Sequence, residues 1–155
     1  VSELDVAAGR LRRTFDVPPR PEAIAVTADG SEVWVGSNED GTVSVIDTRT
    51  GDVETVASGF GWPYRILITP DNRLALIPDL RGHELRVLDR ATRRELHRFP
   101  FPGGGPQGIT VAPDGTTVYH SMSQQGRVAV IDLDRMEVTG SIETSPAPDG
   151  VAVGR

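Results

Sequence analysis

The stretch TADGSEVWV, residues 27–35, recurs twice with small changes, as TPDNRLALI at 69–77 and APDGTTVYH at 112–120. Spacings of 42 and 43 residues separate the turn aspartates of these stretches, Asp29, Asp71 and Asp114. A second series of aspartates with the same spacing ends the runs SELD, SVID, RVLD and AVID, at Asp5, Asp47, Asp89 and Asp132. A fixed period of this length is the sequence signature of a tandem-repeat fold.

Each repeat predicts four short strands separated by turns. In the first complete unit we expect them at Ala23–Thr27, Glu32–Gly36, Thr42–Asp47 and Val53–Val56. We expect the aspartates of both series to bond turn backbone, because Asp favours tight turns and no DxDxDG calcium-binding run is present. Four short antiparallel strands in about 40–45 residues are typical of a β-propeller blade, so the predicted fold is an all-β propeller.

The repeat boundaries divide the chain into a partial unit at 1–20, three complete units at 21–62, 63–105 and 106–148, and the start of another at 149–155. These units predict fifteen strands, or about three and three-quarter blades. Because propellers close with about four to eight blades, we expect a fragment of a longer propeller, with a natural half-propeller as the alternative. Its uncovered blade faces are expected to favour self-association.

Composition excludes several classes of function. The chain has no cysteine and a net charge of -6, which argues against thiol chemistry and against binding to nucleic acid. It contains no apolar run long enough to span a membrane and no visible signal peptide. The first residue is Val1 rather than Met, as removal of a leader or a longer N-terminal region would leave. No GxSxG, HExxH, P-loop or GxGxxG motif is present, so we expect no metal and no cofactor.

The repeats resemble the YVTN-type 40-residue β-propeller repeat, in the segments PEAIAVTADGSEVWVGSNEDGTVSVIDTRTGDVETV (21–56) and PQGITVAPDGTTVYHSMSQQGRVAVIDLDRMEVTGSI (106–142). The middle unit departs from the pattern, with Asn72 and Arg93 where glycine is usual. This resemblance implies a partial propeller from a bacterial protein, periplasmic or secreted, whose complete ring has seven blades. It also implies that ligands bind at the face formed by the D–A loops (fourth strand to next first strand) and the B–C loops (second strand to third).

Candidate ligand-binding residues lie in or beside these loops: Trp62, Tyr64, Arg65, Arg81, His83, Gln107 and His120. Aromatic rings beside arginine are suited to a planar or anionic ligand. The alternative is that Trp62 covers the blade interface and Arg65 pairs with a carboxylate at the rim. His120 aligns with the apolar strand residue Val35 and is therefore expected to point between blades. The arginines of residues 81–98 are expected mainly at the solvated rim, with binding of an anionic partner as the alternative.

The function expected from the sequence is a non-catalytic scaffold that binds an unknown protein or small-molecule ligand at the D–A/B–C loop face. One alternative is a propeller enzyme of the lactonase or streptogramin-lyase kind, which would use groups such as Glu39, Asp79 and His83. A second alternative is a redox-associated propeller, similar to the quinoprotein and cytochrome d1 families. The sequence contains no motif that decides among these three classes.

Overall fold

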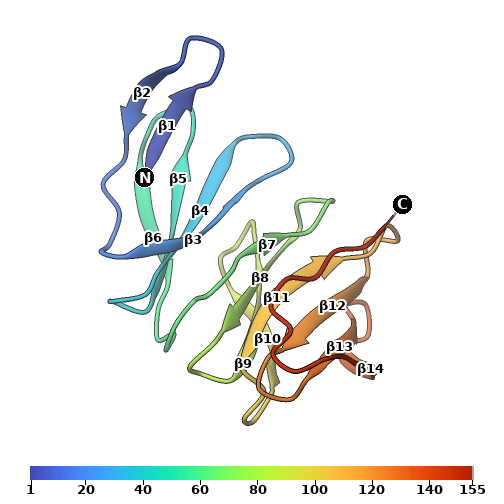
Figure 1. Ribbon diagram of the computed structural model, residues 1–155. Helices are drawn as coiled ribbons and strands as arrows, with labels where there is room; N and C mark the ends of the chain where they lie inside the picture. The colour runs from blue at the N-terminus through green and yellow to red at the C-terminus, as the bar shows by residue number, and fades with distance from the viewer. Residues whose placement is uncertain (155) are drawn as a thin grey trace.

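The computed structural model describes residues 1–154, and these form β-strands and connecting turns without a helix. Three four-stranded antiparallel sheets follow one another along the chain, preceded by a two-stranded hairpin (Figure 1). No segment of residues 1–154 therefore forms a helix able to cross a membrane.

The strands follow the predicted order. The N-terminal hairpin consists of β1 (Ser2–Asp5) and β2 (Arg10–Thr14). Blade 1 consists of β3 (Pro21–Val26), β4 (Glu32–Ser37), β5 (Thr42–Asp47) and β6 (Val53–Ala57). Blade 2 consists of β7 (Leu67–Ile68), β8 (Leu74–Asp79), β9 (Glu84–Asp89) and β10 (Glu95–Pro100). Blade 3 consists of β11 (Pro106–Val111), β12 (Thr117–Met122), β13 (Arg127–Asp132) and β14 (Glu137–Glu143).

Neighbouring blades stack through their sheet faces and meet at their first two strands, as expected of a β-propeller. β3 of blade 1 contacts β7, and β11 of blade 3 contacts β8. One hydrophobic cluster joins blade 1 to blade 2 and includes Trp34, Phe60 and Ile77. A second cluster joins blade 2 to blade 3 and includes Phe101 and Met122. The middle strands of each blade are consequently the most buried, which explains their nearly continuous apolar sequences.

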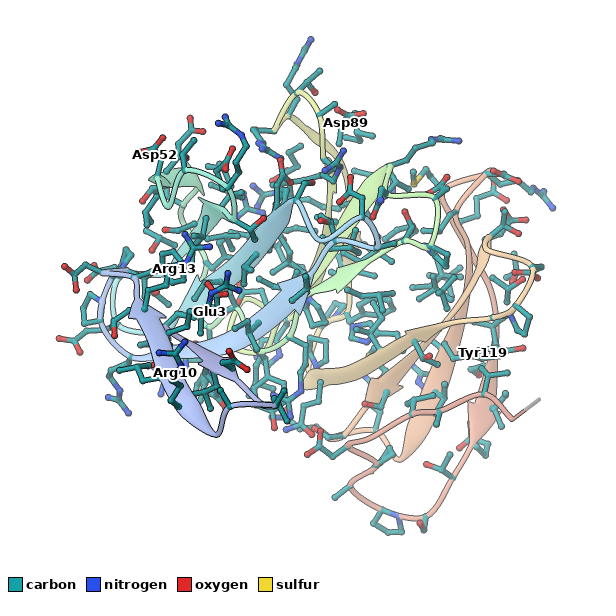
Figure 2. The ribbon with its side chains drawn as sticks, turned by 90° about the horizontal axis from the view of Figure 1, so that it is seen from above. Glu3, Arg10, Arg13, Asp52, Asp89 and Tyr119 are labelled. Atoms are coloured by element: carbon teal, nitrogen blue, oxygen red, sulfur yellow. The ribbon has the colours of Figure 1, made fainter. Side chains whose placement is uncertain are left out.

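The N-terminal hairpin packs on the opposite side of blade 1. Phe15 contributes to a small cluster with Val35 and Ile46 of that blade. Arg13 pairs with Glu3 within the hairpin, as Figure 2 shows, and also donates to the carbonyl of Thr48 in blade 1. The hairpin therefore occupies the place of the last two strands of a preceding blade.

The first aspartate series forms turns, as predicted. Thr27 and Thr69 donate from their hydroxyls to Asp29 and Asp71, at 2.6 Å in both cases. These bonds are the largest cause of a pKa below the ordinary value in both carboxyls. In Asp114 the pKa is lowered mainly by backbone N–H groups of its own turn. Each carboxylate is thus held in its charged form by the turn it stabilises.

The second aspartate series has the same role between the third and fourth strands. Each of its carboxylates accepts backbone N–H bonds from the following turn, at 2.7–3.0 Å. The members are Asp5, Asp47, Asp89 and Asp132. The recurrent aspartates are therefore explained by turn geometry.

The two departures from the repeat pattern in blade 2 bind it to blade 1. Asn72 and Arg93 keep the left-handed backbone of the glycines they replace, with φ of 59° and 63°. The side chain of Asn72 accepts the N–H of Ala28 at 2.8 Å. Arg93 forms an ion pair at 2.6 Å with Glu32, which also accepts the indole N–H of Trp34. Irregular residues in the sequence thus serve as contacts between blades.

Two sequence-based expectations are wrong. The fifteenth strand does not form, because residues 151–154 have no neighbouring strand with which to pair. Arg86, expected with its neighbours at the solvated rim, is only 5% exposed. Its guanidinium lies 3.8 Å from the ring centroid of Phe60 and forms an ion pair with Glu95 at 2.7 Å. The aromatic face and the carboxylate together compensate for removing this charge from water.

Candidate functional site

The loop between blades 1 and 2 is held in place by a buried carboxylate. Asp79, at the end of β8, is 1% exposed. Its oxygens accept the backbone N–H groups of Gly61 and Trp62, at 2.7 and 2.8 Å, and that of Gly82 at 2.8 Å. A side chain at Gly82 would collide with this carboxylate, because an added Cβ would lie 2.4 Å from its Oδ2 atom. Asp79 therefore fixes the loop and has little freedom to act on a ligand.

This loop and the neighbouring loop between β8 and β9 bring together four of the predicted ligand-binding residues. The guanidinium of Arg81 lies 4.6 Å from the ring centroid of Trp62, and that of Arg65 lies 4.2 Å from the ring centroid of Tyr64. The two rings meet edge to face, with centroids 6.2 Å apart. We call these four residues the arginine–aromatic cluster. Each guanidinium is attracted by the negative face of the aromatic ring beneath it, in a cation–π interaction.

Two carboxylates from neighbouring blades contact the aromatic members of the cluster. Glu22, on β3, accepts the indole N–H of Trp62 at 3.1 Å. Asp149, which follows blade 3, accepts the hydroxyl of Tyr64 at 3.4 Å. Ser121 donates to the backbone carbonyl of Asp149 at 2.7 Å and so holds this segment against blade 3. The cluster therefore joins segments of blades 1 and 2 and the segment that follows blade 3.

The arginines of the cluster carry charge that no carboxylate of residues 1–154 neutralises by an ion pair. Arg65 donates to the carbonyl of Tyr64 at 3.0 Å, and Arg81 is exposed. Other arginines, including Arg86, Arg93 and Arg98, do form ion pairs. Guanidinium donors that stay free next to aromatic rings are suited to a planar anion.

Two further candidates, Gln107 and His83, lie outside this cluster. Gln107 is half-buried near the start of β11, and in the described part of the chain its side chain forms no hydrogen bond with the cluster. His83 has φ of 54° and occupies the repeat position of Gly41 and Gly126, which are also left-handed. Its Nδ1 atom is buried and has no hydrogen-bond partner within residues 1–154.

His120 points between blades, as the alignment predicts. It is fully buried, and its ring meets that of Phe101 edge to face at 5.6 Å. Nδ1 lies 2.8 Å from the carbonyl of Gly108, to which it donates, while Nε2 is buried without a partner within residues 1–154. Burial lowers the pKa of His120 to about 4, so the ring is neutral near pH 7. No group of three or more metal-ligating side chains occurs in the described residues.

Sequence reasoning missed the partners of the cluster. Glu22 belongs to a strand, and Asp149 lies in a turn-like segment, PAPDG, that is 85 residues from Tyr64. The repeat alignment contains a signal that could have identified both partners. The residues aligned with Arg65 are Ala23 and Gly150, and Glu22 and Asp149 directly precede them, as Tyr64 precedes Arg65.

The comparisons with known proteins agree on the fold. No model of a known protein family matches the chain. The chain is similar to Kuenenia stuttgartiensis hydrazine synthase, with a TM-score of 0.79 and 28% identity over 90% of this chain and 40% of that one. It is also similar to a periplasmic gluconolactonase of Pseudomonas aeruginosa, with a TM-score of 0.72 and 21% identity over 94% of this chain and 49% of that one.

One curated relative is antigen Lp49 of Leptospira interrogans, 29% identical over 100 residues, which are 56% of this chain and 22% of the relative. The chain thus spans between about a fifth and a half of the length of the proteins it matches. Together with the stacked four-stranded sheets, these similarities identify the chain as a β-propeller.

Proposed function

We propose that the chain is part of a YVTN-type β-propeller that serves as a non-catalytic binding scaffold, with the arginine–aromatic cluster as its ligand-binding site. The observation that carries this proposal is the pair of guanidinium groups, Arg65 and Arg81, each stacked on an aromatic ring and without an ion-pair partner in residues 1–154. In a chain of net charge -6, such a pair selects for a small planar anion.

Isothermal titration with isophthalate, a planar dicarboxylate, tests this proposal. Arg81→Gln and Arg65→Gln should each weaken binding by about tenfold, because each removes a charge-assisted hydrogen bond. Arg94→Gln is the matched control, since Arg94 is an exposed arginine of blade 2 outside the cluster. Equal affinities for the Arg81→Gln and Arg94→Gln chains would contradict the proposal.

A propeller enzyme is the second candidate, because the names of two similar structures are those of enzymes, hydrazine synthase and gluconolactonase. Its acid–base groups would have to come from the same loop face. Asp79 already accepts three backbone N–H bonds there, which favours the scaffold. Hydrolysis of glucono-1,5-lactone by the chain, faster than in buffer alone, would favour the enzyme instead.

We also propose a periplasmic or secreted location and self-association through uncovered faces. The periplasmic location of the similar gluconolactonase supports the first. Exposed apolar side chains at the N-terminal end support the second: Leu4, Leu11, Ile24 and Val26. Light scattering over a range of concentrations tests self-association, which predicts a mass that rises above that of one chain.

A further inference from the structure

The interfaces of blade 2 with its two neighbours are built from equivalent repeat positions. Phe60 donates its backbone N–H to the carbonyl of Gly41, and Phe101 donates in the same way to His83. The two phenylalanines are therefore equivalent residues. Arg86 and Ala129 are likewise equivalent, because both are the third residue of the third strand in their blades, β9 and β13.

Between blades 1 and 2, an arginine fills the space beside the phenylalanine. The guanidinium of Arg86 stacks on Phe60 at 3.8 Å, forms an ion pair with Glu95 at 2.7 Å and donates to the carbonyl of Ser58 at 3.0 Å. Arg98, three residues further along β10, pairs with the same carboxylate. This interface is closed by charged side chains.

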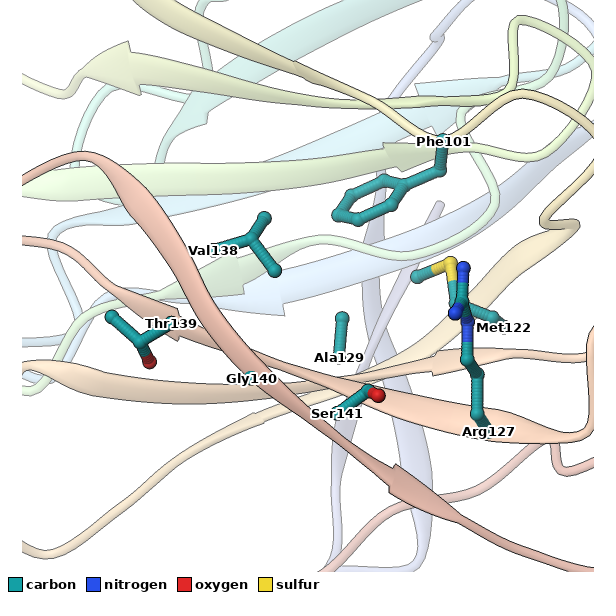
Figure 3. Close-up of a pocket in the computed structure, with 8 residues that line it drawn as sticks. All are labelled: Phe101, Met122, Arg127, Ala129, Val138, Thr139, Gly140 and Ser141. Atoms are coloured by element: carbon teal, nitrogen blue, oxygen red, sulfur yellow. The ribbon is translucent and has the colours of Figure 1, made fainter.

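Between blades 2 and 3, the corresponding side chains are short and uncharged. The register of β14 places Val138 and Ser141 where β10 has Glu95 and Arg98, since each pair faces the same positions of the third strand. With Ala129 in place of Arg86, a pocket of about 290 Å³ remains. Figure 3 shows this pocket, with Phe101 projecting over it.

The pocket has an apolar part and a cationic end. Phe101, Met122 and Val138 supply the apolar part. Arg127 lies at one end, where its Nε group donates to Gln125 at 2.9 Å (Figure 3). Its guanidinium forms no ion pair with any carboxylate of residues 1–154. Ser141 adds a hydroxyl to the lining. A volume near the lower end of the usual range for ligand pockets, roughly 300–1,000 Å³, limits the occupant to a single ring or a short chain.

We propose that this pocket between blades 2 and 3 binds a small amphipathic carboxylate. The apolar body lies against Phe101, Met122 and Val138, and the carboxylate accepts hydrogen bonds from Arg127. A cationic ligand is disfavoured by the same guanidinium. The site lies between Phe101, which follows β10 of blade 2, and strands β12 to β14 of blade 3. It is separate from the arginine–aromatic cluster, so it goes beyond the binding function proposed above.

The test compares 4-phenylbutyrate with 4-phenylbutan-1-ol, an uncharged molecule of similar shape, in titrations of the full chain followed by the NMR signal of the Met122 methyl group. We expect the acid to shift this signal and to bind about tenfold more tightly than the alcohol. Arg127→Gln should remove that difference, whereas Arg94→Gln should leave it unchanged. Equal binding of acid and alcohol to the unmodified chain would overturn the proposal, as would the absence of a shift at millimolar concentrations.

A double variant, Ala129→Arg with Val138→Glu, places the Arg86–Glu95 pair of the neighbouring interface into the pocket. The new arginine should stack on Phe101 and close the site, so that neither compound shifts the Met122 signal. Unchanged binding of the acid to this folded variant would show that it binds elsewhere and would overturn the proposal. If the double variant does not fold, the comparison of acid and alcohol binding by the Arg127→Gln chain tests the proposal.

Discussion

The interface between blades 1 and 2 and the interface between blades 2 and 3 use the same repeat positions with different chemistry. The first is crossed by charged groups, among them Arg86 on Phe60 and Arg93 on Glu32. The second is apolar around Phe101 and contains the fully buried imidazole of His120. A propeller repeat thus fixes the backbone while leaving the contents of each interface free to vary. Charged side chains tie the first interface together, and the second retains a pocket and a buried imidazole.

The largest effect is expected at the charged interface, from Arg86→Ala. Removal of this buried guanidinium leaves Glu95 with Arg98 as its remaining ion-pair partner and exposes the face of Phe60. We expect the free energy of unfolding to fall by about 3 kcal/mol. Chemical denaturation measures it, with Arg135→Ala as the control, because Arg135 pairs with Glu137 at an exposed site and should cost less than about 1 kcal/mol. Equal losses in the two variants would contradict a special role for Arg86.

The apolar interface should make stability depend on pH through His120. The unfolded chain takes up a proton near pH 6.5, whereas the folded chain does so only near pH 4, because burial lowers the pKa of the ring. Stability should therefore fall as the pH decreases through this window, by roughly 3 kcal/mol at most.

The matched variant is His120→Ile, which copies Ile77 at the same position of blade 2. Denaturation curves at several pH values should show the difference between the two chains changing from pH 7 to pH 4, because the carboxylates common to both cancel. A difference that stays constant with pH would show that His120 is not the titrating group.

A smaller effect is expected where Arg93 replaces the usual glycine. Arg93→Ala loses the ion pair with Glu32 and keeps the left-handed backbone, so stability should fall by about 2 kcal/mol. Arg93→Gly loses the same pair but relieves the backbone, and should cost about 1 kcal/mol less. Thermal unfolding of both variants measures this difference. An alanine variant as stable as the glycine variant would contradict the backbone argument.

Much of the fold could be predicted because the residues that form the turns recur at the same positions in each repeat. The turn aspartates and the apolar runs locate each strand of the first complete unit within a residue or two, and the predicted strand Thr42–Asp47 has the bounds of β5. The missing strand at residues 151–154 shows the limit of this reasoning. An alternating sequence pattern shows which residues could form a strand, but the strand forms only when a second strand lies beside it and pairs with its backbone.

Less of the candidate site could be predicted. The sequence placed Trp62, Tyr64, Arg65 and Arg81 in loops of one face, and the structure brings them together as two stacked pairs. The sequence could not show that the carboxylate of Asp79 accepts three backbone hydrogen bonds. Nor could it reveal Arg86 as buried, because an arginine in a strand is charged whether it faces solvent or an aromatic ring of the next blade.

The most direct measurement of the central claim, that the loop face binds an anion through the arginine–aromatic cluster, uses the two indole N–H signals of the chain. Trp62 donates to Glu22 at the cluster, and Trp34 donates to Glu32 from a fully buried position between blades 1 and 2. Titration with isophthalate should shift the Trp62 signal progressively and leave the Trp34 signal in place. Two unmoved signals, or equal shifts of both, would contradict the claim.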